Sequence, residues 1–420
     1  MQKILCFFTA NFPFGSGETF IENEIDFLSN SFDQIIIISN NTKDKQTRNL
    51  PNNVSIVRDD FFLLKRDKVL GLLNIFNPIV FTEIISSFFK KTPIIGTRLN
   101  YLLASYARAE KVVKKVNNLL LKFPSAKNKI YLYSYWCLDE AVGIALLKRK
   151  RPEIIAFSRA HGYDLYAYRQ QNNYLPLRSF LINNLNKLYT ISENGKTHLE
   201  SNYKIKESNN SKIEIARLGT KAHENKLKHN TSPTLRIVSC SYIYPNKRIN
   251  LIAESLIKIK EFDIEWSHLG DFTNWVSESY KQETLELFHT VKNSSNIEFQ
   301  FKGYMSNPEI IDFYAQTPIN IFINVSESEG IPVSIMEAMS FGIPAIATNV
   351  GGTNEIVNQK NGYLIDPEST SEEISNYIKS FYQLPLEEID EKRGLAFETW
   401  NNNYNAEKNY ANFVQNILKL

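Results

Sequence analysis

The stretch INIFINVSESEGIPVSIMEAMSFGIPAIAT, residues 319–348, decides the fold of this chain. It opens with a nearly continuous apolar run, Ile319–Val325, which is typical of a central strand in a parallel sheet. Pro332 suits the first position of a helix, where its missing N–H leaves no bond unmade. Gly342 fits the left-handed position at which a helix ends, and a second apolar run follows at Ala345–Thr348. The stretch therefore predicts a strand–loop–helix–strand unit.

Further strand-like runs alternate with helical patterns along both halves of the chain. In the first half they are Ile4–Thr9, Gln34–Ser39, Val54–Val57, Lys129–Tyr133, Ile154–Ser158, Lys187–Ile191 and Lys212–Ala216; in the second half they are Leu235–Cys240, Ile264–Leu269, Ile297–Lys302, Ile319–Val325, Ala345–Thr348 and Gly362–Ile365. This alternation predicts an α/β protein with two Rossmann-like parallel-sheet domains. We expect them at 1–220 and 221–400, divided by the polar stretch Lys221–Pro233, with a final helix over 401–420 that packs back on the first domain.

The composition is that of a soluble globular protein, with 43% hydrophobic and 22% charged residues among 420. The three cysteines, Cys6, Cys137 and Cys240, lie in apolar runs and are expected to be buried free thiols. This usage favours a reducing compartment and excludes a disulfide framework. The apolar start of the chain is short and shows no secretory signal, so we expect a cytoplasmic protein.

A strongly basic region covers Phe61–Arg151, with 17 Lys or Arg and 5 Asp or Glu, a net charge of +12 that leaves −9 for the rest of the chain. Such an excess favours an anionic partner such as a membrane surface, a phosphate group or a nucleic acid. The alternative is that these side chains only solvate helix faces. No nucleic-acid-binding motif is present, so nucleic acid is not expected. Polar residues interrupt Val69–Phe89, which we expect to form buried or interfacial helices rather than a membrane span.

Two acidic residues, Glu329 and Glu337, follow the first strand of the opening stretch. Ligands of open parallel sheets bind beyond the carboxyl ends of the strands, where the loop 326–330 lies. The helix behind this loop offers free N–H groups and the positive end of its dipole, which suit a phosphate or a sugar. A carboxylate accepts two hydroxyl hydrogen bonds at once, so the two glutamates are candidates for binding a sugar and a ribose. The alternative is that both are solvated helix carboxylates.

Two other strand ends of the second domain carry residues suited to an anionic ligand. Gly351 and Gly352 follow the strand Ala345–Thr348, and paired glycines let the backbone approach a ligand closely. Lys247 and Arg248 follow Leu235–Cys240 at the beginning of a helix. Cations oppose the helix dipole there, and a bound diphosphate would remove the conflict. A plain turn and a solvated basic turn are the alternatives for these two positions.

Together these motifs resemble those of the bacterial group 1, or family four, glycosyltransferases, which have the GT-B fold of two Rossmann-like domains facing across a cleft. The matching elements are Glu329 and Glu337 followed by Ala338-Met339 and Gly342-x-Pro344, Gly351-Gly352-x-x-Glu355, Lys247-Arg248, and His161-Gly162 after a strand of the first domain. The resemblance covers nearly the whole chain and is most specific over Phe299–Asp366. It points to the subgroup that builds cell-surface polysaccharides.

The resemblance implies that a nucleotide-sugar donor binds mainly to the second domain. Lys247 would bind the diphosphate and stabilise the leaving group, Glu329 would contact the donor sugar, and His161 would orient it, so these three are the expected catalytic residues. The other expected donor-binding residues are Arg248, Ser326, Gly330, Ile331, Glu337, Gly351 and Gly352, with Glu337 on the ribose. We expect no metal and no cofactor, since the reaction class needs neither and no Asp-x-Asp motif occurs in the sequence.

Three positions depart from the family pattern. Tyr242 stands where the family usually has an arginine, so Arg248 is expected to compensate. Leu218 replaces the asparagine of an Asn-Gly pair, and Pro332 replaces a glycine and removes one N–H donor. These changes bear on the identity of the donor rather than on the class of reaction.

The loop after the first strand contains Gly15-Ser-Gly17-Glu18. It is not a dinucleotide fingerprint, because Phe20 occupies the position of the third glycine. In the family this loop helps to hold the acceptor, so Gly15, Gly17 and Glu18 are the expected acceptor-binding residues. The alternative for Glu18 is an ordinary acidic residue at the beginning of a helix.

The expected function is therefore retaining, metal-independent transfer of a sugar from a nucleotide diphosphate, linked to UDP or GDP, to a growing, lipid-linked glycan of lipopolysaccharide, capsule or exopolysaccharide. The protein would be cytoplasmic and peripheral at the inner face of the cytoplasmic membrane. The alternatives are a glycosyltransferase with a soluble acceptor, of sucrose or trehalose synthase type, and an inert sugar-nucleotide-binding protein.

Overall fold

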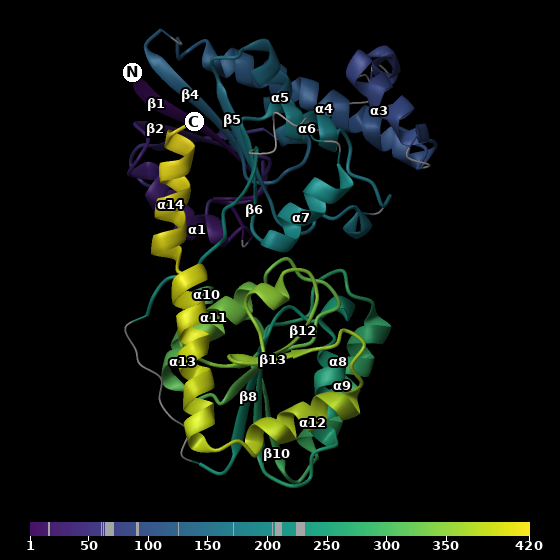
Figure 1. The fold of residues 1–420 in the computed structure, drawn as a ribbon, viewed down its shortest axis with the longest axis vertical. Coiled ribbons are helices and arrows are strands. Elements are labelled where there is room, and N and C mark those ends of the chain that lie inside the picture. Colours follow the sequence, from purple (N-terminus) through teal and green to yellow (C-terminus); the bar gives the residue numbers. More distant parts are fainter. Residues whose placement is uncertain are drawn as a thin grey trace. The chain divides into compact units, whose positions relative to one another are not determined.

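The computed structural model describes residues 1–15, 17–59, 61, 63, 71–89, 92–124, 126–170, 172–203, 205, 212–223 and 232–420. The chain forms two units, each built around a parallel sheet (Figure 1). The N-terminal unit consists of Met1–Leu218 and Tyr410–Leu420, and the C-terminal unit consists of Gly219–Asn409. The expected linker Lys221–Pro233 lies outside the described residues from 224 to 231.

The sheet of the N-terminal unit has the order β3-β2-β1-β4-β5-β6-β7, and every neighbouring pair is parallel. Its strands are β1 (Gln2–Thr9), β2 (Gln34–Ser39), β3 (Val54–Arg58), β4 (Asn128–Ser134), β5 (Ile155–Ala160), β6 (Lys187–Thr190) and β7 (Ile213–Ile215). Each lies within two residues of its predicted position, because β-branched and aromatic runs were the signal. The chain order reverses between β1 and β4, which we call the N-terminal switch point.

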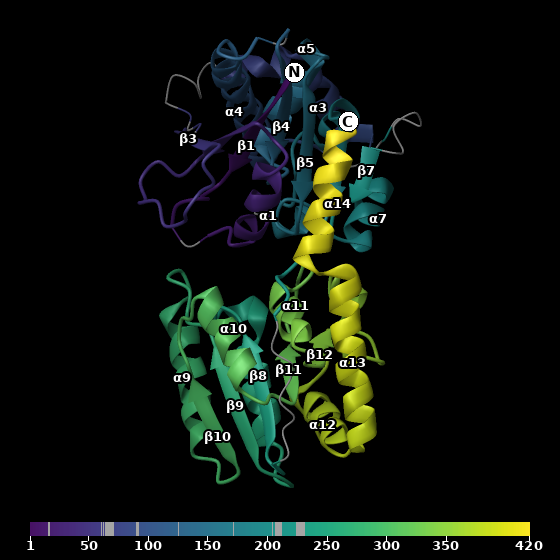
Figure 2. The ribbon, with the colours of Figure 1, turned by 90° about the vertical axis from the view of Figure 1, so that its left-hand side faces the viewer.

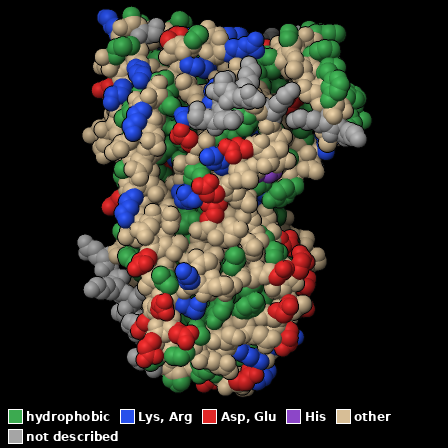
Figure 3. All heavy atoms as spheres, in the orientation of Figure 1, with side chains coloured by type: hydrophobic (Ala, Val, Ile, Leu, Met, Phe, Trp, Pro, Cys, Tyr) green, Lys and Arg blue, Asp and Glu red, His purple; other side chains and the backbone are tan. Residues whose placement is uncertain are grey.

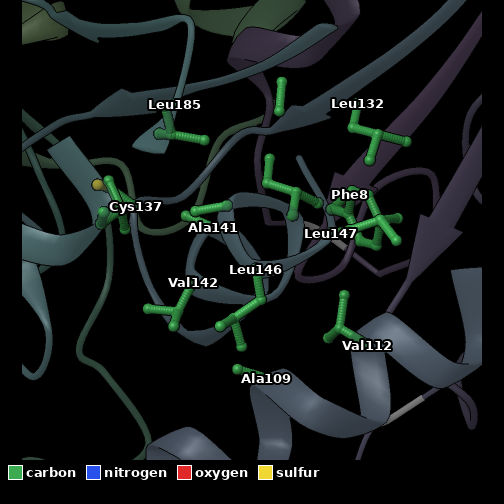
Figure 4. Packing of buried hydrophobic residues seen from close by; sticks show 14 of the residues in the cluster. Phe8, Ala109, Val112, Leu132, Cys137, Ala141, Val142, Leu146, Leu147 and Leu185 are labelled. Carbon is green, nitrogen blue, oxygen red and sulfur yellow. The ribbon is translucent and has the colours of Figure 1, made fainter. Parts of the chain in front are cut away.

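Helices cover both faces of this sheet. They are α1 (Phe20–Ser29), η1 (Leu72–Phe76), α3 (Pro78–Phe89), α4 (Thr97–Leu120), α5 (Asp139–Lys150), η2 (Ala167–Arg169), α6 (Arg178–Asn184) and α7 (Glu193–Asn202). Figure 4 shows how α4 and α5 bury apolar side chains against Phe8 and Leu132 of the sheet. A Cβ on Gly143 would lie 2.6 Å from the Cβ of Val112, so glycine lets these two helices approach closely.

The other face of this sheet is aromatic and is covered in part by the end of the chain. Phe413 of α14 (Ala406–Leu418) lies 5.6 Å from Tyr133 and 6.2 Å from Phe157, measured between ring centroids. Figure 2 shows α14, in yellow, along this unit. The single helix predicted over 401–420 is wrong, since α13 (Leu386–Asn403) ends before α14 begins. The Asn405 side chain accepts a hydrogen bond from the N–H of Glu407 at 3.0 Å and thereby starts a new helix.

The sheet of the C-terminal unit has the order β10-β9-β8-β11-β12-β13, again with parallel neighbours. Its strands are β8 (Leu235–Cys240), β9 (Ile264–Leu269), β10 (Ile297–Phe301), β11 (Ile321–Asn324), β12 (Ala345–Thr348) and β13 (Gly362–Ile365). β11 is shorter than predicted because the N–H of Ile319 closes a tight turn onto the carbonyl of Thr317 at 2.9 Å. The order reverses between β8 and β11, the C-terminal switch point.

The helices of this unit are η4 (Pro245–Lys247), α8 (Ile249–Ile257), α9 (Glu278–Lys292), α10 (Asn307–Gln316), α11 (Val333–Ser340), η5 (Thr353–Glu355), α12 (Ser371–Tyr382) and α13. Figure 1 shows α8 and α9 on one side of the sheet and α11 and α13 on the other. Gly342 ends α11 with the predicted left-handed φ of 63°, while Pro332 lies one residue before the helix rather than at its first position. Among the described helices of the chain, none has a stretch long and apolar enough to cross a membrane.

Candidate active site

The C-terminal switch point brings together two of the predicted catalytic residues. Lys247 ends η4 after β8, and Glu329 lies in the loop after β11. The Lys247 Nζ is 2.5 Å from the Glu329 Oε1, and the two side chains are 18% and 11% exposed. Ligand crevices of parallel sheets form where the strand order reverses. The structure therefore places a partly buried cation and carboxylate, 82 residues apart in sequence, at the edge where a ligand is expected.

The glycine pair after β12 supports the loop that carries Glu329. Gly351 has a φ of 54°, and a Cβ built on it would lie 1.9 Å from the carbonyl oxygen of Glu329. The N–H of Gly352 donates to the carbonyl of Gly330 at 2.6 Å. The predicted donor-binding residues Gly330, Gly351 and Gly352 thus lie against one another. Both the backbone conformation and the close contact require glycine at position 351.

Glu337, the fifth residue of α11, is 8% exposed and accepts a hydrogen bond from the Asn307 side chain at 2.5 Å. Burial raises the pKa of this carboxyl from 4.5 to about 7, against the opposing effect of the Asn307 amide. Glu329 is 9% exposed. The alternative that these two glutamates are solvated helix carboxylates is therefore wrong.

Arg248, predicted to help bind a diphosphate, also connects two strand ends of this unit. Its guanidinium donates to the carbonyl of Val325 at 2.5 Å and to that of Pro367 at 2.8 Å. Its Nη2 is buried and makes no hydrogen bond to the described residues. Arg248 itself has a left-handed φ of 48°. The guanidinium therefore connects the chain after β11 with the chain after β13. Its Nη2 remains able to donate a hydrogen bond to a ligand.

Two further predicted donor-binding residues, Ser326 and Ile331, have buried side chains in the loop between β11 and α11. Ser326 is 1% exposed, and its carbonyl accepts a hydrogen bond from the hydroxyl of Thr348 at 2.6 Å. Ile331 is 4% exposed. Tyr242, which stands at the usual arginine position, is 48% exposed in the loop after β8. Only this last side chain is open to solvent, so Ser326 and Ile331 offer a ligand their backbone at most.

The N-terminal switch point contains a cavity of about 280 Å³. Its lining includes Thr9 at the end of β1, Trp136 and Asp139 after β4, and Asn40 and Glu140, together with the apolar residues Phe8, Ala10, Phe61 and Leu138. Burial raises the pKa of the Glu140 carboxyl, and the neighbouring Asp139 adds to this, while the Asn40 amide at 2.7 Å opposes it. A wall with an aromatic ring, carboxylates, an amide and hydroxyls can bind both the apolar face and the hydroxyl groups of a sugar.

The Glu18 carboxylate is fully engaged within the N-terminal unit. It accepts hydrogen bonds from the N–H groups of Ala10, Asn11 and Phe12 at 2.9, 2.6 and 2.6 Å, and from the indole of Trp136 at 2.6 Å. Glu18 has a left-handed φ of 56° and precedes α1. It therefore fixes the loop after β1 and orients Trp136, which is more than an ordinary acidic residue at a helix start would do.

The other two predicted acceptor-binding residues, Gly15 and Gly17, are held from a neighbouring loop. Arg48 donates to the carbonyl of Gly15 and, at 3.1 Å, to that of Gly17. Gly15 has a φ of 60°, which explains the glycine. Ser16 between them lies outside the described residues. The loop is thus anchored at both ends by side chains of its own unit.

His161 follows β5 and is 7% exposed. The centroid of its ring lies 4.6 Å from that of Tyr135 and 4.7 Å from that of Trp136. The backbone N–H of His161 donates a hydrogen bond to the Asp164 carboxylate at 2.7 Å. Burial works to raise the pKa of Asp164, but His161 and the N–H groups of Cys137 and His161 lower it overall. His161 thus lies beside the cavity residue Trp136, and its Nε2 accepts no hydrogen bond from the described residues.

Two features of the N-terminal unit are not among the predictions. The predicted site does not include Trp136, Asp139 and Glu140, although they follow the predicted strand Lys129–Tyr133 and stand at its carboxyl end. No partner of Glu24 is predicted either. In the structure Glu24 and Arg159 form an ion pair of 2.6 Å with both side chains fully buried. No local pattern signals a pairing across 135 residues.

Within the part of the chain that the structure describes, no group of three or more His, Cys, Asp or Glu side chains is arranged to hold a metal ion. The described cysteines Cys6, Cys137 and Cys240 are free thiols. Burial raises the pKa of Cys6 and of Cys240 to about 12, so neither is a reactive thiolate.

Comparisons with known proteins agree with this geometry. Residues 221–394 match the family model described as Glycosyl transferases group 1, which confirms the predicted enzyme class for the C-terminal unit. A protein of Escherichia coli (strain K12) named as a colanic acid biosynthesis glycosyltransferase, WcaL, is 24% identical over 241 residues, 54% of this chain and 55% of that protein. This chain thus aligns with about half the length of that relative.

Two solved structures share the whole fold. The lipopolysaccharide outer core galactosyltransferase WaaB in its apo form has a TM-score of 0.67 at 16% identity, and both chains are covered completely. HepE of Anabaena, crystallised with UDP-glucose, has a TM-score of 0.65 at 13% identity, with the same coverage. The chain therefore has the GT-B fold and carries the domain of the group 1 glycosyltransferases.

Proposed function

We propose that this protein transfers a sugar, with retention of anomeric configuration, from a nucleotide diphosphate to a lipid-linked glycan of a bacterial surface polysaccharide. The observation that carries the proposal is the partly buried pair of Lys247 and Glu329 at the C-terminal switch point. A donor with a diphosphate and a sugar supplies a new partner for each member of this pair.

The reaction begins with an exchange of partners at this pair. The diphosphate of the donor takes the Lys247 ammonium, and Glu329 is then free to accept hydrogen bonds from sugar hydroxyls. As the bond between the sugar and the diphosphate breaks, negative charge grows on the leaving group. A fixed ammonium in a partly buried site stabilises that charge without a metal ion.

Glu337 is proposed to hold the ribose. Its ionised carboxylate can accept two hydroxyl hydrogen bonds, which suits a vicinal diol. The carboxyl is buried and already bonded to Asn307 at 2.5 Å, so its position is fixed before the donor binds. Because burial disfavours the ionised form, donor binding and ionisation of Glu337 should favour one another.

The cavity at the N-terminal switch point is proposed to bind the sugar of the acceptor. Trp136 offers an aromatic face, while Asp139 and Glu140 offer carboxyl groups for its hydroxyls. Glu18 contributes by orienting Trp136 through the bond of 2.6 Å to its indole. His161, packed on Trp136, is proposed to orient the donor sugar through its Nε2.

The relatives support the choice of substrates. WcaL is named for the biosynthesis of colanic acid, WaaB for the outer core of lipopolysaccharide, and HepE was crystallised with UDP-glucose. The basic region Phe61–Arg151 fits a protein that works at an anionic membrane surface, so we place the reaction at the inner face of the cytoplasmic membrane.

The test is a thermal-shift and hydrolysis screen of UDP-, GDP- and ADP-sugars. A donor present at a hundred times its Kd should stabilise the protein by about 2.7 kcal/mol. Lys247→Ala should abolish both the shift and the hydrolysis. The matched control is Lys258→Ala, which removes an exposed ion pair with Glu372 in the same unit and should leave both readouts unchanged. Normal sugar transfer by Lys247→Ala would overturn the proposed function.

The same screen separates the alternatives. An inert sugar-nucleotide-binding protein would show the shift without hydrolysis or transfer. A glycosyltransferase of sucrose or trehalose synthase type would transfer to a free sugar or sugar phosphate as readily as to a lipid-linked acceptor.

A further inference from the structure

A cavity of about 470 Å³ in the N-terminal unit lies outside the proposed sugar sites. One wall is a face of α4 that contains Leu103, Ala104 and Ala107, and Leu72 of η1 also lines the cavity. Its volume falls in the range of roughly 300–1,000 Å³ that small-molecule sites occupy. The side chains of the two alanines are too small to fill the cavity. Such a wall suits a hydrocarbon rather than a sugar, because it offers few hydrogen-bonding groups.

This apolar cavity adjoins the cavity of the N-terminal switch point, which has more polar groups, since Arg108 lines both. The Arg108 guanidinium pairs with Asp139, and the hydroxyl of Ser105 also donates to Asp139. The boundary between the two cavities is therefore a fixed polar group. An amphiphile could therefore place its sugar in the cavity of the N-terminal switch point and its hydrocarbon chain in the apolar cavity.

The outer surface of η1 and α3, residues 72–89, is apolar and exposed. It presents Leu73, Phe76, Phe81, Ile85, Phe88 and Phe89, and Phe76 and Phe89 are 82% and 85% exposed. Figure 3 shows these hydrophobic side chains gathered where Figure 1 places α3. Phe81, Ile85 and Phe88 follow helical spacing on one face, while Val80 on the inner face is fully buried. A helix that is apolar on both faces needs an apolar environment outside.

The only charged residue of η1 and α3 is turned inward. Glu83 accepts hydrogen bonds from the hydroxyl of Tyr174 at 3.1 Å and from the N–H of Leu177 at 3.3 Å. Leu72 belongs to both surfaces, because it is 58% exposed and lines the apolar cavity. The cavity and the outer surface are therefore continuous.

We propose that the apolar cavity binds the hydrocarbon chain of the acceptor, which enters from the membrane along η1 and α3 while its sugar occupies the cavity of the N-terminal switch point. The inference rests on the proposed function and names its acceptor as an amphiphile. The net charge of +12 over Phe61–Arg151 attracts an anionic leaflet. The same charge repels a second copy of this surface, which argues against a dimer as its cover.

The test uses alkyl glucosides of increasing length below their critical micelle concentrations, with methyl β-D-glucopyranoside as the head-group control. Each methylene that is buried strengthens binding by up to about fourfold, so octyl glucoside should bind roughly tenfold more tightly than hexyl glucoside in calorimetry. Ala104→Trp fills the cavity and should remove the dependence on chain length. Asn118→Trp, at an exposed position further along α4, is the matched control and should retain it.

Two results would overturn the inference. One is octyl glucoside binding no more tightly than methyl glucoside, or equally tightly to Ala104→Trp and Asn118→Trp. The other is a stable dimer in sedimentation that Phe88→Glu dissociates, since a second copy would then cover the surface. Thermal shifts with UDP in the same variants report on the C-terminal unit alone. A failure of the cavity proposal leaves both these shifts and the hydrolysis of the nucleotide sugar intact, whereas a failure of the proposed function removes the shifts, the hydrolysis or both.

Discussion

The two switch points have the same topology, but the loop glutamates Glu329 and Glu18 have different kinds of partner. At the C-terminal switch point a cation faces a carboxylate, Lys247 and Glu329, through one hydrogen bond of 2.5 Å. At the N-terminal switch point the Glu18 carboxylate accepts hydrogen bonds from four N–H donors, and no ion pair joins it to a described residue. The first arrangement can exchange its internal partners for a charged ligand. The second cannot release its partners without losing the shape of the loop.

Ion pairing alone does not identify a ligand site in this protein. The pair of Glu24 and Arg159 in the N-terminal unit has almost the same length, 2.6 Å, yet both side chains are completely buried. The Arg159 guanidinium also lies 4.2 Å from the ring of Phe413. The attraction of Glu24 raises the pKa of Arg159, although burial opposes this. This pair is part of the core, and exposure is what separates it from Lys247 and Glu329.

The largest expected effect comes from breaking the buried pair. Arg159→Met leaves the Glu24 carboxylate uncompensated and should lower the free energy of unfolding by roughly 3–5 kcal/mol, as measured by urea denaturation. The double variant Arg159→Met with Glu24→Leu should recover most of that loss, because no unpaired charge remains. If the single variant were as stable as the wild type, the contrast between a structural and an exchangeable pair would be lost.

A smaller effect concerns the pH dependence of Glu337. Its pKa is raised from 4.5 to about 7, so its contribution to stability is complete below pH 4.5 and is lost as the pH rises through 7. Ribose binding needs the ionised form, so the affinity for UDP should increase over the same range, by about tenfold from pH 6 to pH 8. Calorimetric titrations of the wild type and of Glu337→Gln measure this.

The variant Glu337→Gln controls for titration of the UDP phosphates, which is the same in both proteins. It should show a weaker affinity and no additional gain above pH 6. An equal pH dependence in the two proteins would show that Glu337 does not contact the nucleotide.

The smallest effect comes from adding a positive charge near the pair of Lys247 and Glu329 at the C-terminal switch point. Tyr242→Arg restores the cation that the family usually has, at a position that is 48% exposed. An exposed ion pair is worth about 0.2–1 kcal/mol, so UDP should bind about threefold more tightly, and less so at high salt. The control is Leu386→Arg, which adds the same charge at an exposed position at the beginning of α13. Equal gains in both variants would mean that only the net charge matters.

Local sequence patterns predict most of the fold and the residues of the C-terminal switch point. The strands are apolar runs of fixed length, and Gly342, Ser192 and the glycine at 351 have local conformational reasons. Ser192, for example, accepts a hydrogen bond from the N–H of Gly195 at 2.9 Å at the beginning of α7. These features depend on residues that are close together in the chain, so the sequence alone is sufficient.

The remaining features depend on contacts between distant residues. The ion pair of Glu24 and Arg159 joins two elements 135 residues apart, and Glu18 meets Trp136 across 118 residues. Arg248 reaches the carbonyl of Pro367 over 119 residues. A carboxylate or guanidinium looks the same in the sequence whether it faces solvent, a ligand or the backbone. Only the folded chain distinguishes these environments.

The close approach of Gly351 to the loop of Glu329 limits how this protein can be redesigned. Any side chain at position 351 would have to displace the Glu329 carbonyl, which lies 1.9 Å from where its Cβ would stand. Most variants in a library at this position would therefore lose the conformation of the Glu329 loop and would not gain specificity for a new sugar. Attempts to change the donor are better directed at solvent-accessible side chains of the neighbouring loops, such as Tyr242, where the backbone can remain as it is.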